Sequence, residues 1–408
     1  MKSSLAFAAL AACIAGGGAA AQDKNIKIGV LTDMSGVYSD IAGPGSVLAA
    51  NMAVEDSGLR DKGWKIDVIA ADHQNKPDIA TSIARQWADL ENVDVYLNLN
   101  NSGVALAVNP VAVEKNRIHL NTGAATSALT GKACTPNTIH WTYDTYELAN
   151  GTGKAVTLAG GDTWFFVTAD YTFGAALEAD TSAVVVKNGG KILGDVKHPL
   201  NSADFSSFLL QAQASKAKVI GLANTGADTV NAVKQAAEFG IQQGGQKLAA
   251  LLLFIPNVNA MGLQVAQGLQ LTSSFYWDLN DDTRAFSRRY AARSKNNAEP
   301  SMEQAGDYAA VLHYLKTLAV LGGNPHDGAL VVAKMKEMPT DDPAFGKGSI
   351  RADGSKIHPA YLFEVKKPAE SKGPWDYYKL IATIPAEEAF RPLAQSECPL
   401  VKKSATAQ

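Results

Sequence analysis

Small hydroxyl-bearing residues and backbone amides follow two predicted strands of this chain. Ser102 stands after Asn101 at the start of a predicted helix, and the stretch Ala124-Ala125-Thr126 follows the next strand. Backbone N–H groups at a helix start, joined by a serine or threonine hydroxyl, favour an anion. We therefore expect these residues to bind a carboxylate. The alternative is that Ser102 and Thr126 each only cap the helix that follows.

Aromatic residues stand in the same set of predicted loops. They are Tyr38, Tyr171, Phe173, Phe254, Tyr276 and Trp277. Binding clefts are lined mainly by apolar and aromatic walls with a few polar groups, so ligand contact is one interpretation and core packing is the other. Tyr38 lies in a polar loop between Gly36 and Asp40, which favours ligand contact for this residue.

Motifs that would indicate catalysis or a cofactor do not occur in the sequence. It contains no GxxxxGK[ST], no GxGxxG after a strand, no GxSxG and no HExxH. Its seven histidines are scattered without the spacing of metal ligands. We expect no metal, no cofactor and no enzymatic activity.

Length and charge limit the classes of protein to which this chain can belong. A chain of 408 residues exceeds the size at which a single core keeps growing, so we expect two lobes with a cleft between them. Hydrophobic residues make up 46% and charged residues 19%, as in folded globular proteins. The formal net charge of −3 provides no basic field for nucleic acid. We expect a monomer without a nucleic-acid partner.

The first residues have the pattern of an export signal. Residues 1–21 contain one lysine, an Ala-rich apolar run and three alanines before Gln22, which predicts a signal peptide cleaved after Ala21. The alternative is lipid attachment at Cys13, which follows Leu10-Ala11-Ala12. No other segment reaches the roughly 20 apolar residues of a membrane span. In an oxidising compartment the two remaining cysteines, Cys134 and Cys398, are expected to form a disulfide, with two separate buried thiols as the alternative.

Predicted strands and helices alternate in two successive series. The strands are expected at 26–31, 64–70, 93–99 and 117–121, then at 163–169, 191–196, 218–223 and 247–254. This alternation predicts an α/β fold with two parallel sheets, one in each lobe. Further helices and short strands follow both series, including a hairpin turn at Asp353-Gly354, so the chain is expected to cross between the lobes more than once, through a multi-strand hinge. Loops at the carboxyl ends of the strands would form the ligand crevice.

Several segments together carry a family resemblance. They are KIGVLTDMSGVYSDIAGPGSVLAANMAVED, DHQNKPDIATSIARQ, NTGAATSALTG, TADYTFGAALE and DFSSFLLQAQASKAKVIGL. In this order they resemble the periplasmic leucine/isoleucine/valine-binding family, the type I solute-binding proteins of ABC transporters. The resemblance implies two Rossmann-like lobes joined by three strands, which close on a ligand, and an inner-membrane ABC permease as partner.

The resemblance also implies lobe boundaries and site residues. The N-terminal lobe would comprise 23–143 and 276–347, the C-terminal lobe 144–275 and 348–398, and the tail 399–408. Ligand-binding residues carried over by position are Tyr38, Ser102, Ala124, Ala125, Thr126 and Phe173, with Asn224 or Thr225, and Tyr276 or Trp277.

One loop departs from the family pattern. Amino-acid binders place a glutamate there for the ligand ammonium, whereas this chain has Ile255-Pro256-Asn257-Val258. Because an unpaired buried ammonium is costly, we expect a small carboxylate that lacks the α-amino group, with an aromatic or apolar body. Asp228 or Asp307 could replace the missing acid, which keeps an amino-acid ligand as the alternative. Two different functions also stay open, a ligand sensor for a signalling partner and a secreted enzyme.

Overall fold

The computed structural model describes residues 23–401 of the chain. The predicted signal peptide, its cleavage site and Cys13 lie outside these residues, as does most of the predicted tail. Within the described part of the chain, no helix is both long and apolar enough to span a bilayer.

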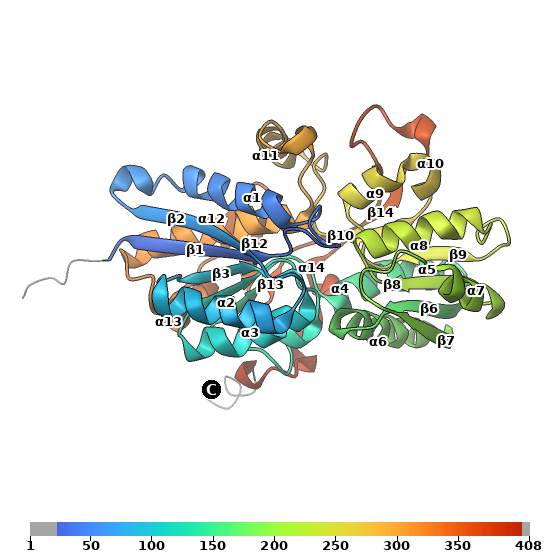
Figure 1. Ribbon diagram of the computed structural model, residues 1–408, viewed down its shortest axis with the longest axis horizontal. Helices are drawn as coiled ribbons and strands as arrows, with labels where there is room; N and C mark the ends of the chain where they lie inside the picture. Colours follow the sequence, from blue (N-terminus) through green and yellow to red (C-terminus); the bar gives the residue numbers. More distant parts are fainter. Residues whose placement is uncertain (1–22, 402–408) are drawn as a thin grey trace, which may run out of the picture.

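Two lobes lie side by side, each built on a parallel sheet (Figure 1). The sheet of the N-terminal lobe has the order β2-β1-β3-β4-β5. Its strands are β1 (Asn25–Thr32), β2 (Lys65–Asp72), β3 (Val95–Asn98), β4 (Ile118–Asn121) and β5 (Thr138–His140). Helices α1 (Gly43–Ser57), α2 (Pro77–Leu90), α3 (Ser102–Glu114), α12 (Met302–Leu321) and α13 (Gly328–Glu337) accompany this sheet. Every residue of β3 and β4 is buried, as expected for central parallel strands covered on both faces.

The C-terminal lobe repeats this architecture with the strand order β7-β6-β8-β9. Its strands are β6 (Thr163–Ala169), β7 (Lys191–His198), β8 (Val219–Ala223) and β9 (Lys247–Ala250). Its helices are α5 (Lys154–Leu158), α6 (Thr172–Lys187), α7 (Ser206–Ala214), α8 (Ala227–Glu238), α9 (Ile255–Met261) and α10 (Leu263–Ala266). The predicted strand 247–254 is too long, because β9 pairs only with β8 and its last partner is Leu222.

The rest of the chain forms two small antiparallel sheets and the crossings between the lobes. The first sheet contains β10 (Gln270–Ser273), β14 (Ala360–Val365) and β15 (Tyr378–Ile384), and the second β11 (Thr340–Asp342), β12 (Gly346–Ile350) and β13 (Lys356–Ile357). Two short helices, α4 (Thr145–Leu148) and α14 (Ala386–Ala389), and the longer α11 (Asp281–Ala291) complete the fold. Within residues 23–401 the lobes are connected between β5 and α4, between β10 and α11, and between β13 and β14 (Figure 1). The exact lobe boundaries stay a prediction.

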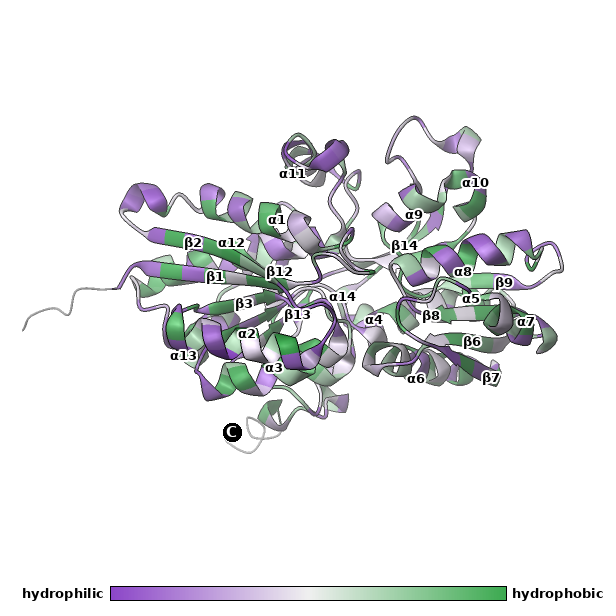
Figure 2. Ribbon diagram, viewed as in Figure 1, coloured by the Kyte–Doolittle hydropathy of each residue, from purple (hydrophilic) through white to green (hydrophobic). Residues whose placement is uncertain are grey.

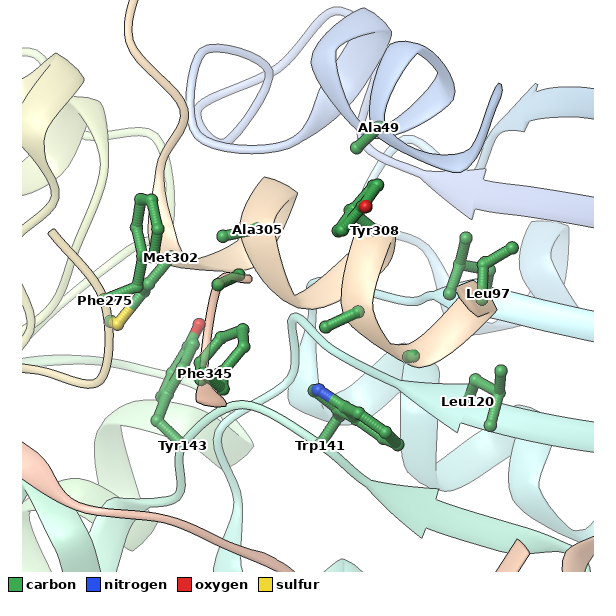
Figure 3. Close-up of a cluster of buried hydrophobic side chains, with 14 of the residues drawn as sticks. Ala49, Leu97, Leu120, Trp141, Tyr143, Phe275, Met302, Ala305, Tyr308 and Phe345 are labelled. Atoms are coloured by element: carbon green, nitrogen blue, oxygen red, sulfur yellow. The ribbon is translucent and has the colours of Figure 1, made fainter. Parts of the chain in front are cut away.

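Apolar residues gather on the strands and on the helix faces that cover them (Figure 2). Helix α12 is buried along most of its length, with Ala305 and Tyr308 packed in the same cluster as Leu97, Leu120 and Trp141 (Figure 3). The start of α12 reaches the boundary between the lobes. Its first turn contacts the loop after β1, where Gln304 Nε2 donates to Ala42 O at 3.0 Å.

The structure confirms the two parallel sheets, the multi-strand hinge and the hairpin at Asp353-Gly354, where β12 and β13 pair. Cys134 and Cys398 form the predicted disulfide, with Cα atoms 5.6 Å apart. The disulfide attaches the last described segment of the chain to the N-terminal lobe.

Candidate functional site

A small cavity lies between the lobes, at the carboxyl ends of the parallel strands. Loops after β1, β3 and β4 form one wall, loops after β6, β8 and β9 form the other, and the first turn of α12 adds Glu303. This is the position that open parallel sheets favour for ligands. The lining residues are Tyr38, Ile41, Asn100, Ser102, Gly123, Ala124, Ala125, Tyr143, Tyr171, Phe173, Thr225, Leu252 and Glu303.

A larger hollow opens near the disulfide. Its charged side chains pair with one another: Arg391 with Asp180 at 3.0 Å, and Lys132 with Glu397 at 3.5 Å. The smaller cavity is lined by three residues that each have a buried polar atom without a partner: Asn100 Nδ2, Thr225 Oγ1 and Glu303 Oε2. It is therefore the stronger candidate for a ligand site.

Ser102 contributes a hydroxyl that its helix does not use. The cap of α3 is Asn101, whose Oδ1 accepts hydrogen bonds from Gly103 N at 3.0 Å and Val104 N at 3.1 Å. Ser102 Oγ accepts from Thr126 N at 3.2 Å, which leaves the hydroxyl hydrogen of Ser102 for another acceptor. The interpretation of Ser102 as a helix cap is therefore wrong.

Two further donors face the cavity from the N-terminal lobe. In the described part of the chain, the backbone N–H of Ala125 makes no hydrogen bond. Asn100 Oδ1 accepts from Asp33 N at 3.0 Å and lies 3.1 Å from His73 Nε2, so the side-chain amide of Asn100 is oriented by its surroundings. Its Nδ2 is buried without a partner.

His73 supports this orientation of Asn100. Burial lowers the pKa of His73 to about 4, so the ring is neutral at physiological pH. Its Nδ1 accepts from Asn75 N at 3.0 Å, which places the ring proton on Nε2, facing Asn100. Asn100 therefore points a donor, not an acceptor, at the cavity.

Contacts across the cavity join the two lobes. Tyr38 Oη and Tyr171 Oη are 2.6 Å apart, and Ala227 N donates to Val37 O at 3.2 Å. Burial is the main cause that raises the pKa of Tyr38 and that of Tyr171, so both phenols stay protonated. Thr225 Oγ1 is also buried without a partner, on the C-terminal side. The lobes are thus in contact around the cavity.

Glu303 places a carboxyl group in the wall. The side chain is only 1% exposed; Oε1 lies 2.8 Å from Tyr143 Oη, and Oε2 has no partner. Tyr143 Oη also lies 2.7 Å from Gly123 O. Burial is the largest cause that raises the pKa of Glu303 well above the ordinary value.

The acids proposed from the sequence as substitutes are engaged elsewhere. Asp228 accepts from Asn201 N at 3.1 Å and Ser202 N at 2.9 Å, and it fastens a loop of its own lobe. Asp307 accepts from Thr122 Oγ1, and Asn98 Nδ2 lies 3.2 Å from its Oδ2. Neither lines the cavity, whereas Glu303, one turn before Asp307 on α12, does.

Six of the predicted ligand-binding residues line the cavity: Tyr38, Ser102, Ala124, Ala125, Phe173 and Thr225. Four do not: Thr126, Asn224, Tyr276 and Trp277. Thr126 caps the short helix after it, with Oγ1 accepting from Ala128 N at 3.4 Å. Asn224 bonds to Thr229 Oγ1 at 2.6 Å and to His198 Nε2 at 3.0 Å.

Tyr276 and Trp277 make their contacts at the antiparallel sheet of the C-terminal lobe, away from the cavity. The ring of Tyr276 lies 5.0 Å from that of Tyr378, and Trp277 Nε1 donates to Trp375 O at 2.8 Å. Their packing against β14 and β15 explains their separation from the cavity. No ligand contact is proposed for them.

Seven cavity residues were not among the residues predicted to bind ligand: Ile41, Asn100, Gly123, Tyr143, Tyr171, Leu252 and Glu303. Of these, Tyr171 was expected only as one of the loop aromatics that either contact ligand or pack in the core. Asn100 and Tyr171 stand in loops that the sequence places at strand ends, so their position was the available signal. Glu303 had no such signal, because it belongs to a helix that follows both series of strands.

Comparison with known proteins gives a consistent result. The sequence profile of the family described as "Periplasmic binding protein" matches residues 25–373. A periplasmic binding protein from Burkholderia mallei is 53% identical, with a TM-score of 0.89 over 92% of this chain and 99% of that chain. A branched chain amino acid ABC transporter periplasmic ligand-binding protein from Burkholderia xenovorans is 39% identical, with a TM-score of 0.81 over 92% and 100%.

A more distant solved structure shares the fold. The solute binding protein of an ABC transporter from Rhodopseudomonas palustris, in complex with benzoate, is 20% identical. Its TM-score is 0.81, over 92% of this chain and 100% of that chain. At this identity the similarity shows the fold alone.

Proposed function

Because this chain belongs to the family of periplasmic binding proteins, we propose that it captures a small organic carboxylate between two lobes that close over it. The family resemblance expected from the sequence is confirmed: the chain is a non-enzymatic, extracytoplasmic solute-binding protein of an ABC transporter. The identity of the solute is the part that we propose.

The unpaired donors on the N-terminal side support a carboxylate. Asn100 Nδ2, Ala125 N–H and the Ser102 hydroxyl face one cavity and lack acceptors within the described residues. Leaving buried donors unsatisfied costs about 1–3 kcal/mol each, so these groups favour a ligand that brings acceptors. A carboxylate has two oxygens with about four lone-pair sites, enough for all three donors.

The remaining wall supports an apolar or aromatic body. Phe173, Leu252 and Ile41 line the cavity, whereas residues 255–258, where the sequence departs from the family pattern, do not. The benzoate bound by the Rhodopseudomonas palustris relative is consistent with an aromatic acid. The Burkholderia xenovorans relative, named for branched-chain amino acids, keeps an amino acid as the second candidate.

Closure is the proposed mechanism. The ligand bridges donors of the N-terminal lobe and the apolar wall of the C-terminal lobe, and so shifts the population toward the closed form. The Tyr38–Tyr171 and Ala227–Val37 hydrogen bonds then add to the stability of that form. The membrane permease recognises the closed protein.

A thermal-shift screen tests this function. We expect benzoate-type, cinnamate-type or short branched acids to raise the melting temperature, because a ligand at 100 times its Kd adds about 2.7 kcal/mol to the native state. Leucine, isoleucine and valine form the comparison set. If only amino acids stabilise the protein, an acid without an α-amino group is the wrong ligand class.

A further inference from the structure

Glu303 is a buried acid without a cationic partner. In the described part of the chain, the ionisable groups that act on it are Tyr143, Asp307 and Asp33, and Tyr171 responds to its charge. None of these groups is a base that could neutralise a glutamate anion. The neutral side chains of Tyr143 and Asn98 act to lower the pKa of Glu303, but burial raises it by more. A charged Glu303 would therefore have neutral donors beside it and no cation.

The oxygen positions around Tyr143 require one more proton than the tyrosine has. Tyr143 Oη lies 2.7 Å from Gly123 O and 2.8 Å from Glu303 Oε1, and both distances are those of hydrogen bonds. A tyrosine hydroxyl carries a single proton, and a carbonyl oxygen carries none. If Tyr143 donates to Gly123 O, the second bond needs a proton on Glu303 Oε1, donated to Tyr143.

That arrangement leaves Glu303 Oε2 as a carbonyl-type acceptor. It has no partner among the described residues, and its residue lines the cavity. Oε2 is also 2.9 Å from the point where a side chain on Gly123 would begin, so the acid lies against the same loop that presents Ala125 N–H. One cavity thus offers donors for an anion and a neutral acceptor beside them.

We propose that Glu303 is a specificity-determining residue of this cavity: as a neutral carboxylic acid bonded to Tyr143, it presents Oε2 to a hydroxyl group on the ligand. The inference rests on the proposed carboxylate-binding function and adds the second functional group. The ligand class is then a hydroxylated acid. Ligand binding leaves the proton of Glu303 in place.

A ligand ammonium would require a different arrangement. Pairing with an ammonium would favour the Glu303 anion, and Tyr143 would turn its proton to that anion. Gly123 O would then lose its donor while an oxygen atom remained 2.7 Å away. A ligand hydroxyl group that donates to Oε2 of neutral Glu303 leaves both hydrogen bonds of Tyr143 Oη in place, one with Gly123 O and one with Glu303 Oε1.

Matched ligands test the proposal by calorimetric titration. The aliphatic set is 4-methylpentanoate, 2-hydroxy-4-methylpentanoate and leucine, which differ in one substituent. The aromatic set is benzoate with 2-, 3- and 4-hydroxybenzoate. In at least one set we expect a hydroxylated acid to bind about 10-fold more tightly than its parent acid.

Two variants identify the residue responsible. Glu303→Gln keeps a neutral acceptor and a donor for Tyr143, so the preference for the hydroxylated acid should persist within about threefold. Glu303→Leu removes the acceptor and should abolish the preference, while the parent acid still binds. Asp307→Asn, a buried acid on the same helix outside the cavity, should leave the preference unchanged.

Wild-type protein provides a readout that no folding defect can affect. Titrations in two buffers of different ionisation enthalpy should show no net proton exchange when the hydroxylated acid binds. Release of about one proton per site, with leucine as the tightest ligand and a loss above 100-fold in Glu303→Gln, would overturn the proposal. An equal preference in wild type and Glu303→Leu would also overturn it and leave the proposed function intact. If no acid of either set binds, the proposed function fails, and this inference with it.

Discussion

Gly226 lies where the two lobes meet, and a single methyl group there should oppose closure. It follows β8 in the C-terminal lobe with φ 66° and ψ −140°. A Cβ at this position would lie 2.4 Å from Val37 O and 2.8 Å from Tyr38 Cδ1, both in the N-terminal lobe. In the open form that the proposed mechanism requires, the lobes separate and these contacts are absent.

The expected loss of ligand affinity follows from two hydrogen bonds between the lobes that the added methyl group would disturb. Carbon and oxygen atoms seldom approach within about 3 Å, so Gly226→Ala moves Val37 O by about 0.6 Å or more. That shift weakens the Ala227–Val37 bond of 3.2 Å and the Tyr38–Tyr171 bond of 2.6 Å. At about 0.5–1.5 kcal/mol each, losing both reduces affinity about 5- to 150-fold.

A second cost of this substitution must be separated from the first. Alanine in this glycine region of backbone space costs about 1–3 kcal/mol in the open and closed forms alike. It therefore lowers the melting temperature of the ligand-free protein without changing Kd. Gly262→Ala is a matched control, because Gly262 has φ 78° and ψ 150° and nothing lies within 4 Å of its Cβ position.

The assay is calorimetric titration of both variants with the acid that gives the largest thermal shift in the screen, together with X-ray scattering. Both variants should melt lower than the parent, but only Gly226→Ala should bind more weakly and need a higher ligand concentration to become compact. Equal Kd values for the two variants would refute closure through this contact. Compaction of Gly226→Ala at the same ligand concentration as the parent would refute it as well.

Three further predictions concern the anion-binding half, the disulfide and a buried acid. Ser102→Ala should weaken carboxylate binding about 5- to 10-fold without unfolding the protein, since it removes one hydrogen-bond donor; an unchanged Kd would remove Ser102 from the site. Cys134→Ser should lower the free energy of unfolding by about 2–5 kcal/mol, because the bond to Cys398 spans 264 residues; equal denaturation midpoints would contradict this. Burial raises the pKa of Asp307 from 3.8 to about 7, so the folded protein keeps a proton that the unfolded chain loses. Stability should therefore fall by up to about 4 kcal/mol as pH rises from about 4 to about 7. Asp307→Asn should flatten this slope in urea denaturation, and identical slopes would show that Asp307 does not titrate in this range.

Much of the N-terminal wall of the cavity could be predicted because its residues follow their strands directly. Ser102 and Ala125 stand just after β3 and β4, and parallel strands bring their carboxyl ends to one edge of the sheet. The proposal that Tyr38 contacts ligand rests on the same rule. Local order along the chain is enough for such residues.

The opposite wall was less predictable. Of the two candidates after β8, Thr225 lines the cavity and Asn224 bonds within its own lobe. Adjacent residues point to different sides of the chain, and the sequence contains no signal for which one faces the ligand. The ring of Tyr276 packs on Phe363 of β14 and Tyr378 of β15, and Trp277 donates to Trp375 O just before β15. These partners follow the third crossing, about 85 residues or more along the chain, so the sequence around Tyr276 and Trp277 gives no sign of them.

By itself the sequence determined the α/β class, the two lobes and the disulfide pair, and it led to the proposal of an anion-binding edge, since these depend on periodicity, cysteine count and the order of loops. Only the tertiary structure decided that Glu303 meets Tyr143 and Gly123. Helix α12 is buried on nearly all sides, so its pattern cannot show which residue reaches the cavity. The contacts of Tyr143 Oη with Gly123 O and Glu303 Oε1 depend on distances that arise only when distant segments pack together.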